Sequence, residues 1–103
     1  VITNEGRYAF TSNFGSGTIS SYEISADGGI QLLNGAAAFM GDASQPVDSS
    51  YVATSNAHFL YQLLRGPGAV AAFSIKEDAS LISLGTIVGG LPANNGISGL
   101  AGY

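Results

Sequence analysis

Asp48 and Arg65 are the two side chains whose types most favour binding or catalytic chemistry in this sequence. A carboxylate can act as a general base or bind a metal ion, and a guanidinium can hold a carboxylate or phosphate with two parallel hydrogen bonds. Each also has a structural interpretation, because turn carboxylates often bond local N–H groups and surface arginines often stabilise turns. There is no cysteine and a single histidine, His58, so thiolate nucleophiles, disulfides and multi-histidine zinc sites are excluded.

Charge and composition narrow the function classes further. The 103 residues include 3 basic and 7 acidic side chains, a formal net charge of −4, and 15 glycines. An acidic chain lacks the basic face that nucleic-acid binding requires, so no nucleic-acid partner is expected. No apolar run reaches the roughly 20 residues of a membrane helix, so no membrane span is expected. Hydrophobic residues make up 46% of the chain, enough to build a packed core.

The elements that must position Asp48 and Arg65 are indicated by an internal repeat with a spacing of 51 residues. Seven positions are identical in this register, namely Val1/Val52, Thr3/Thr54, Gly15/Gly66, Gly17/Gly68, Ile24/Ile75, Asp27/Asp78 and Leu33/Leu84. Aromatic residues fall in the same register, with residues 8–10 over 59–61 and Tyr22 over Phe73. A repeat of this length points to one supersecondary unit used twice.

Each unit is predicted to contain four short antiparallel strands. In order, the expected strands cover 1–3 and 51–54, 8–12 and 59–63, 18–24 and 69–75, and 30–33 and 81–84. Glycine- and aspartate-containing turns separate them, with Asp27 and Asp78 as turn formers. Four strands per unit of this length are typical of a propeller blade. The fold class expected is all-β, with about two four-stranded antiparallel blades, one at 1–50 with a clipped first strand and one at 51–103. The aromatic residues Tyr8, Phe10, Tyr22, Phe59, Tyr61 and Phe73 are the expected core.

The residues that carry the repeat also carry a family resemblance. Segments 7–22 and 58–73, the approach 45–48, and the closing segments 90–93 and 96–101 resemble the seven-bladed β-propeller lactonases, the 6-phosphogluconolactonase-like family with a Tyr-Val-Thr-Asn repeat. The resemblance implies that the chain is the last two blades of a longer protein. Segment 62–65 departs from the small polar run of the family pattern.

Propeller geometry sorts the loops into two ends, and the resemblance makes one of them the substrate side. That end is expected to hold Asp42, Gln45 and Asp48 before an inner strand, and Asn13, Phe14 and Arg65 in turns between second and third strands. His58 matches Arg7, in a turn expected at the opposite end, so it is not a candidate for catalysis.

Two functions follow as hypotheses. The resemblance implies a hydrolase that opens a sugar or organic-acid lactone, with Asp48 and Arg65 as candidate catalytic residues and a lactone or sugar acid as ligand. The alternative is a non-catalytic propeller module for binding or structure. No cofactor or metal site is expected, and a bound divalent cation is left open. Two blades leave open sheet edges, so further blades or copies of the chain are the expected partners, and an isolated chain is expected to be inactive and unstable as a monomer. Extracellular, periplasmic and cytoplasmic locations are all left open.

Overall fold

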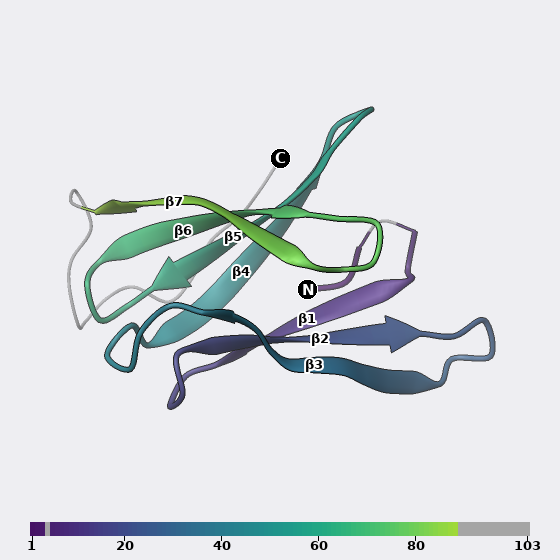
Figure 1. Cartoon of the computed structure of the whole chain (residues 1–103), viewed down its shortest axis with the longest axis horizontal. Coiled ribbons are helices and arrows are strands. Elements are labelled where there is room, and N and C mark those ends of the chain that lie inside the picture. Colours follow the sequence, from purple (N-terminus) through teal and green to yellow (C-terminus); the bar gives the residue numbers. More distant parts are fainter. Residues whose placement is uncertain (4, 89–103) are drawn as a thin grey trace.

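The computed structural model describes residues 1–3 and 5–88, and this part of the chain is all-β (Figure 1). Seven strands form two antiparallel sheets, of three strands in the order β1-β2-β3 and four strands in the order β4-β5-β6-β7. We call these sheets A and B. Their strands are β1 (Tyr8–Asn13), β2 (Thr18–Ile24) and β3 (Ile30–Phe39), then β4 (Pro46–Ala53), β5 (His58–Leu64), β6 (Ala69–Ile75) and β7 (Leu81–Val88). The predicted all-β class is confirmed.

The strands form where β-branched and aromatic residues alternate with small ones, and glycine or aspartate turns end them. β2 and β6 have the predicted bounds. The first strand of sheet B differs from the prediction, because β4 begins at Pro46 rather than at residue 51. Proline is tolerated at a first strand position, and a bulge between Pro46 and Ser49 restores the pairing with β5. This strand therefore crosses the boundary placed at residue 50.

The expectation of four strands in each unit holds for sheet B alone. Residues 1–3 add only the isolated bridge between Ile2 and Ala9 to sheet A. Two backbone hydrogen bonds flank it, from the Thr3 N–H to the Tyr8 carbonyl at 2.9 Å and from the Phe10 N–H to the Val1 carbonyl at 2.8 Å. The segment is too short for a ladder. The closing segments 90–93 and 96–101 lie outside the described residues.

The strand pairings repeat at the spacing of 51 residues. Tyr8 pairs with Glu23 as Phe59 pairs with Ser74, and Tyr22 pairs with Leu32 as Phe73 pairs with Ser83. The bulge that follows Leu32 also has its counterpart after Ser83. The pairings differ only further along β3, which carries two more residues than β7, because Ile19 pairs with Ala38 whereas Val70 pairs with Ile87.

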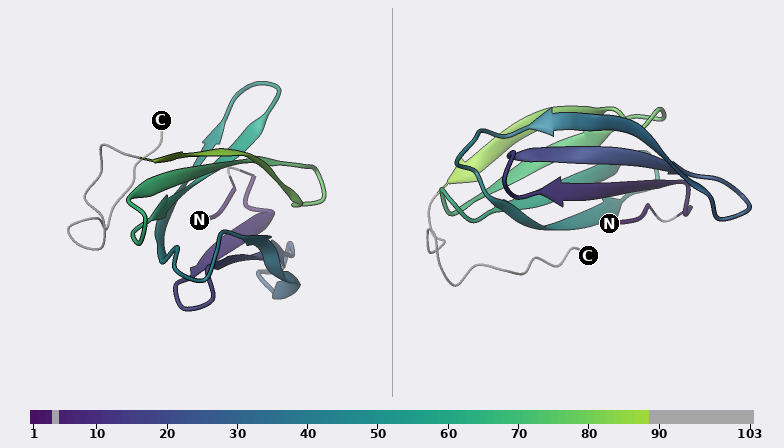
Figure 2. Two further views of the ribbon diagram at one scale, coloured as in Figure 1. Left: turned by 60° about the vertical axis from the view of Figure 1, so that its left-hand side comes forward. Right: turned by 90° about the horizontal axis from the view of Figure 1, so that it is seen from below.

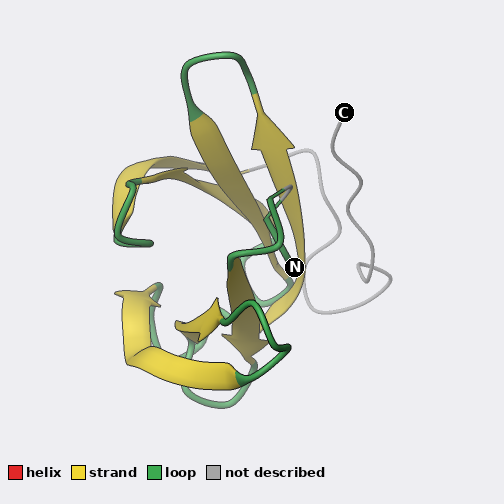
Figure 3. Ribbon diagram, turned by 90° about the vertical axis from the view of Figure 1, so that its right-hand side faces the viewer, coloured by secondary structure: helices red, strands yellow, loops and turns green. Residues whose placement is uncertain are grey.

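The two sheets pack face to face, and their packed faces form one core (Figure 3). β1 and β4 contact each other on one side of the molecule, while β3 and β7 are the outer strands of their sheets. The buried hydrophobic residues of the core are Tyr8, Phe10 and Ile19 from sheet A, and Leu60, Leu64, Ala69, Ala71, Phe73, Ile75 and Ala79 from sheet B and its last turn. The sheets remain open and do not close on each other.

Three of the six aromatic residues predicted for the core are buried, and three are not. Tyr8, Phe10 and Phe73 are buried, whereas Tyr22, Phe59 and Tyr61 are only half-buried. The reason is the side of the sheet on which each residue lies. Opposite residues of an antiparallel pair share a face, so Tyr22, paired with Ala9 and Leu32, lies on the outer face of sheet A. Nowhere in the described residues does a helix occur with the length and hydropathy that membrane crossing requires.

Candidate functional site

The sequence-predicted site residues gather at one end of the molecule, which we call the loop end. It is formed by the β1–β2 turn, the connection from β3 to β4, and the β5–β6 turn, at the left of Figure 1. Backbone hydrogen bonds tie these three segments together. The Met40 N–H donates to the Gly17 carbonyl at 2.8 Å, and the Gly66 N–H donates to the Ser44 carbonyl at 3.0 Å. These three segments are therefore in contact with one another.

Arg65 follows β5 directly and is held at the loop end by its backbone. Its N–H donates to the Gln45 carbonyl at 3.0 Å. The side chain is half-buried, and its Nε is a buried nitrogen without a hydrogen-bond partner, the only such side-chain atom among residues 1–3 and 5–88. A buried donor left unpaired costs about 1–3 kcal/mol.

Asp48 lies within β4, not in the loop before it, which corrects the sequence-based placement. Its Oδ1 accepts a hydrogen bond from the backbone N–H of Ser49 at 3.0 Å, and its carbonyl accepts one from Gln62 Nε2 at 2.9 Å. The carboxylate therefore has the local N–H contact that the structural interpretation of this residue requires. The bulge at the start of β4 explains the placement, since it draws residues 46–48 into the strand.

The four other predicted residues have different environments. Asn13 is engaged within sheet A, where its Nδ2 donates to Thr18 Oγ1 at 2.9 Å and to Ser20 Oγ at 2.8 Å. Phe14 and Asp42 are exposed. Gln45 has a φ of +52°, an uncommon conformation for a residue with a side chain, and it is half-buried. Gln45 and Phe14 are therefore available to a ligand at this end, and Asn13 is not.

A shallow hollow of about 460 Å³ lies at the loop end. It is lined by Met40, Gly41, Ala43, Ser44, Gln45, Gly66 and Pro67. Only Gln45 of these was a sequence candidate. Gly66 and Pro67 could have been found from the turn that contains them, whereas the contribution of residues 40–44 depends on how the β3–β4 connection folds back onto that turn.

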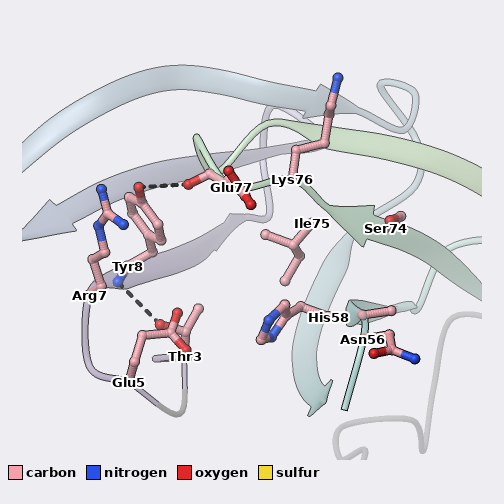
Figure 4. A pocket seen from close by; sticks show the side chains of 11 residues that line it. Thr3, Glu5, Arg7, Tyr8, Asn56, His58, Ser74, Ile75, Lys76 and Glu77 are labelled. Atoms are coloured by element: carbon pink, nitrogen blue, oxygen red, sulfur yellow. Dashed lines mark hydrogen bonds between the residues drawn. The ribbon is translucent and has the colours of Figure 1, made fainter. Parts of the chain in front are cut away.

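The opposite end contains a second hollow, of about 720 Å³, between the two sheets (Figure 4). Arg7, His58 and Lys76 line it together with the acidic Glu5 and Glu77. Lys76 extends away from His58 in Figure 4, so the cationic groups do not converge. His58 is engaged with Tyr51, through a hydrogen bond between its Nδ1 and the Tyr51 hydroxyl and through stacked rings with centroids 5.9 Å apart. These contacts give His58 a structural role.

Two turn carboxylates, Asp27 after β2 and Asp78 after β6, have lowered pKa values. The Ser25 hydroxyl and then the Gly29 N–H stabilise ionised Asp27, which lowers the pKa of its carboxyl. Ser80 lowers the pKa of Asp78 in the same way, through its side chain and its N–H at 3.0 Å. Both predicted turn formers are confirmed. Among the described residues no group of three or more His, Asp or Glu side chains could hold a metal ion.

Comparison of the chain with family models, with curated proteins and with solved structures finds no match.

Proposed function

We propose that this chain is a two-blade sector of a lactonase-like β-propeller and that it serves as a structural and anion-binding module. The repeat of strand pairing at 51 residues supports the blade assignment, since β1 and β2 of sheet A pair in the same register as β5 and β6 of sheet B. Each sheet also places its unit's turn acid, Asp27 or Asp78, at the same point. Sheets that repeat and pack face to face are the elements from which propellers are built.

The observation that carries the binding function is the half-buried side chain of Arg65 beside Gln45 at the loop end, whose Nε has no hydrogen-bond partner. Arg65 is the one basic residue at the loop end among the described residues, because Arg7 and Lys76 line the hollow at the other end. The planar guanidinium of an arginine side chain suits a carboxylate, because its two terminal nitrogens can each donate to one oxygen. The ligand we propose is therefore a sugar acid or another small organic acid, with its carboxylate on Arg65 and its body over the hollow beside Gln45.

Calorimetric titration with gluconate, a simple sugar acid, tests this binding. We expect Arg65→Gln to weaken gluconate binding at least tenfold, because the bidentate contact is lost, and Arg65→Lys to weaken it as well. The matched control is Arg7→Gln, which removes the same charge at the opposite end and should leave the affinity unchanged. Equal effects of Arg65→Gln and Arg7→Gln, or no binding by the unaltered chain, would reject the Arg65 site.

Lactone hydrolysis is the second candidate. It is favoured because Asp48 and Arg65 come from two paired strands that meet at the loop end. Pro46 pairs with Leu64, so the start of β4 and the end of β5 bring both residues to the loop end. In this reaction Asp48 takes a proton from water, the hydroxide attacks the ring carbonyl, and Arg65 stabilises the oxyanion. The ring C–O bond then breaks, and the alkoxide takes the proton to give the hydroxy acid. The contact from the Ser49 N–H to Asp48 makes this candidate weaker than binding alone.

A panel of sugar and organic-acid lactones separates the two candidates. Turnover that is lost in Asp48→Asn and kept in Asp42→Asn, an exposed loop-end carboxylate, would support hydrolysis. Binding of gluconate without turnover of any lactone would support the module.

A further inference from the structure

The two sheets pack through faces that are not equivalent in the repeat. Phe10 lies on the packed face of sheet A, and the residue 51 positions later, Tyr61, lies on the outer face of sheet B. Phe73 lies on the packed face of sheet B, and its counterpart Tyr22 lies on the outer face of sheet A. In the 51-residue repeat, the outer face of sheet A thus corresponds to the packed face of sheet B, and the outer face of sheet B corresponds to the packed face of sheet A.

The outer face of sheet A is apolar and uncovered. Ile30 is 70% exposed, Leu32 56% and Phe39 64%, and the half-buried Tyr22 lies between them in the register. Within the strands no Asp, Glu, Lys or Arg pairs onto this face. Exposed apolar surface of this kind marks an interaction site. Figure 2 shows the three strands of this sheet side by side.

The outer face of sheet B is apolar as well and is open toward β7. Ile82 is 48% exposed and Ile87 78%, while Phe59 and Tyr61 are half-buried. Ser50 and Leu63 on the same face are already buried, so the accessible part lies toward β7. The pairings of β5, β6 and β7 place no charged residue on this face either.

We infer that a second copy of this chain docks head to tail, with the outer face of its sheet B on the outer face of sheet A. The occupant follows from the repeat, because the chain already contains one joint between these two kinds of face. Its packed core shows that a face carrying Tyr8 and Phe10 fits a face carrying Phe73 and Ile75. Applied between copies, the same joint brings Phe59 and Tyr61 of one copy against Tyr22 and Ile24 of the next.

A joint between unlike faces is heterologous, so each added copy presents the same free face again and the series ends only by closing into a ring. The inference rests on the repeat arrangement proposed above and not on the Arg65 ligand. A monomeric chain that still binds gluconate would reject the docking alone, and an assembled chain without gluconate affinity would reject the ligand alone.

Two variants test the direction of the joint. Leu32→Glu charges the outer face of sheet A, and Ile87→Glu charges that of sheet B; both replace exposed side chains. Light scattering after size exclusion should give the unaltered chain a mass of several times 10.4 kDa and each variant the monomer mass of 10.4 kDa. An equimolar mixture of the variants should form a 1:1 pair, because each still has the face that the other lacks. Phe14→Glu, at the exposed loop end, should assemble like the unaltered chain.

Each other outcome overturns the inference. A monomeric unaltered chain rejects self-association. Dimers of Ile87→Glu alone, or of Leu32→Glu alone, indicate joints between like faces, and variants that stay monomeric when mixed reject the head-to-tail joint. Should either variant fail to fold by circular dichroism, hydrogen–deuterium exchange of the unaltered chain replaces it. Raising the concentration should then protect β3 and β7 together, and protection of only one of them, or of neither, rejects the joint.

Discussion

Ser12 donates a hydrogen bond to Oε1 of Gln62 at 2.7 Å and so joins sheet A to sheet B through a polar contact. Gln62 is fully buried, and its amide nitrogen donates to the carbonyls of Asp48 at 2.9 Å and Leu63 at 3.1 Å. A buried amide is tolerated when its hydrogen bonds are made, and here both atoms have partners. This side chain therefore fixes the position of β5 relative to both β1 and β4.

Replacing Gln62 should destabilise the fold through the groups that it leaves behind. We expect Gln62→Leu to lower the free energy of unfolding by about 1–3 kcal/mol, because the hydroxyl of half-buried Ser12 and the Asp48 carbonyl lose their partner. Ser12→Ala should cost about 1 kcal/mol. Urea denaturation of both variants and of the double variant measures their coupling. Effects that simply add to within about 0.3 kcal/mol would contradict the contact.

The β5–β6 turn should tolerate no side chain at Gly66. A Cβ built there overlaps the carbonyl oxygen of Ala43 and lies 3.2 Å from that of Ser44, so backbone must move. Gly66→Ala is expected to cost about 1–3 kcal/mol, the range for overpacking. Its control is Gly15→Ala, in the β1–β2 turn, where a Cβ meets nothing within 4 Å. Thermal unfolding that shifts equally in both variants would contradict the close approach.

The turns after β2 and β6 each contain one residue with a left-handed backbone, and the two turns use different residue types there. Gly28 has a φ of +89°, and its counterpart Ala79 has a φ of +70°. Gly28→Ala should lose about 1–2 kcal/mol of stability from strain alone, since a Cβ there has open space. Ala79→Gly should change stability by less than about 0.5 kcal/mol, because relief of strain offsets the loss of a buried methyl group. Chemical denaturation distinguishes the two, and a neutral Gly28→Ala would contradict the strain argument.

The same turns should make the fold sensitive to acid. The folded state lowers the pKa of Asp27 and of Asp78 below the ordinary value of 3.8, so the two carboxylates stabilise it above that value. This contribution is lost as the pH falls below 3.8 through the folded-state pKa values. Asp27→Asn with Asp78→Asn should therefore flatten the dependence of stability on pH in that range. Denaturant midpoints measured from pH 5 to pH 2 check it, and an unchanged slope would contradict the turn contacts.

The local sequence pattern predicted most strands well. The start of β4 and the face of each sheet that is buried depend on how strands and sheets pack together. Alternation and turn chemistry gave β2 and β6 at their observed bounds, and the Asp27 and Asp78 turns. The start of β4 was wrong because a bulge, which depends on the partner strand, extends it to Pro46. Tyr22 was assigned to the core because an aromatic residue in an alternating strand has the same local pattern on either face. Which face is covered depends on the neighbouring sheet.

The sequence indicated which end of the molecule holds the candidate site, but not the environment of each residue in it. Arg65 and Gln45 were expected at the same end, and a backbone hydrogen bond joins them there. The buried state of the Arg65 Nε could not be predicted, because it depends on tertiary packing and not on local pattern. Sequence position also placed Asp48 in a loop, whereas β4 holds it in the ladder region.

The two additional residues of β3 show where this architecture accepts changes in length. Its first pairs with β2 match those of β7 with β6, and the surplus is taken up near Asn34 to Ala37, before pairing resumes at Ala38. The inner strands keep their alignment because the outermost strand absorbs the insertion. An epitope tag or a reporter peptide grafted at that site would consequently extend into solvent and leave the interior undisturbed.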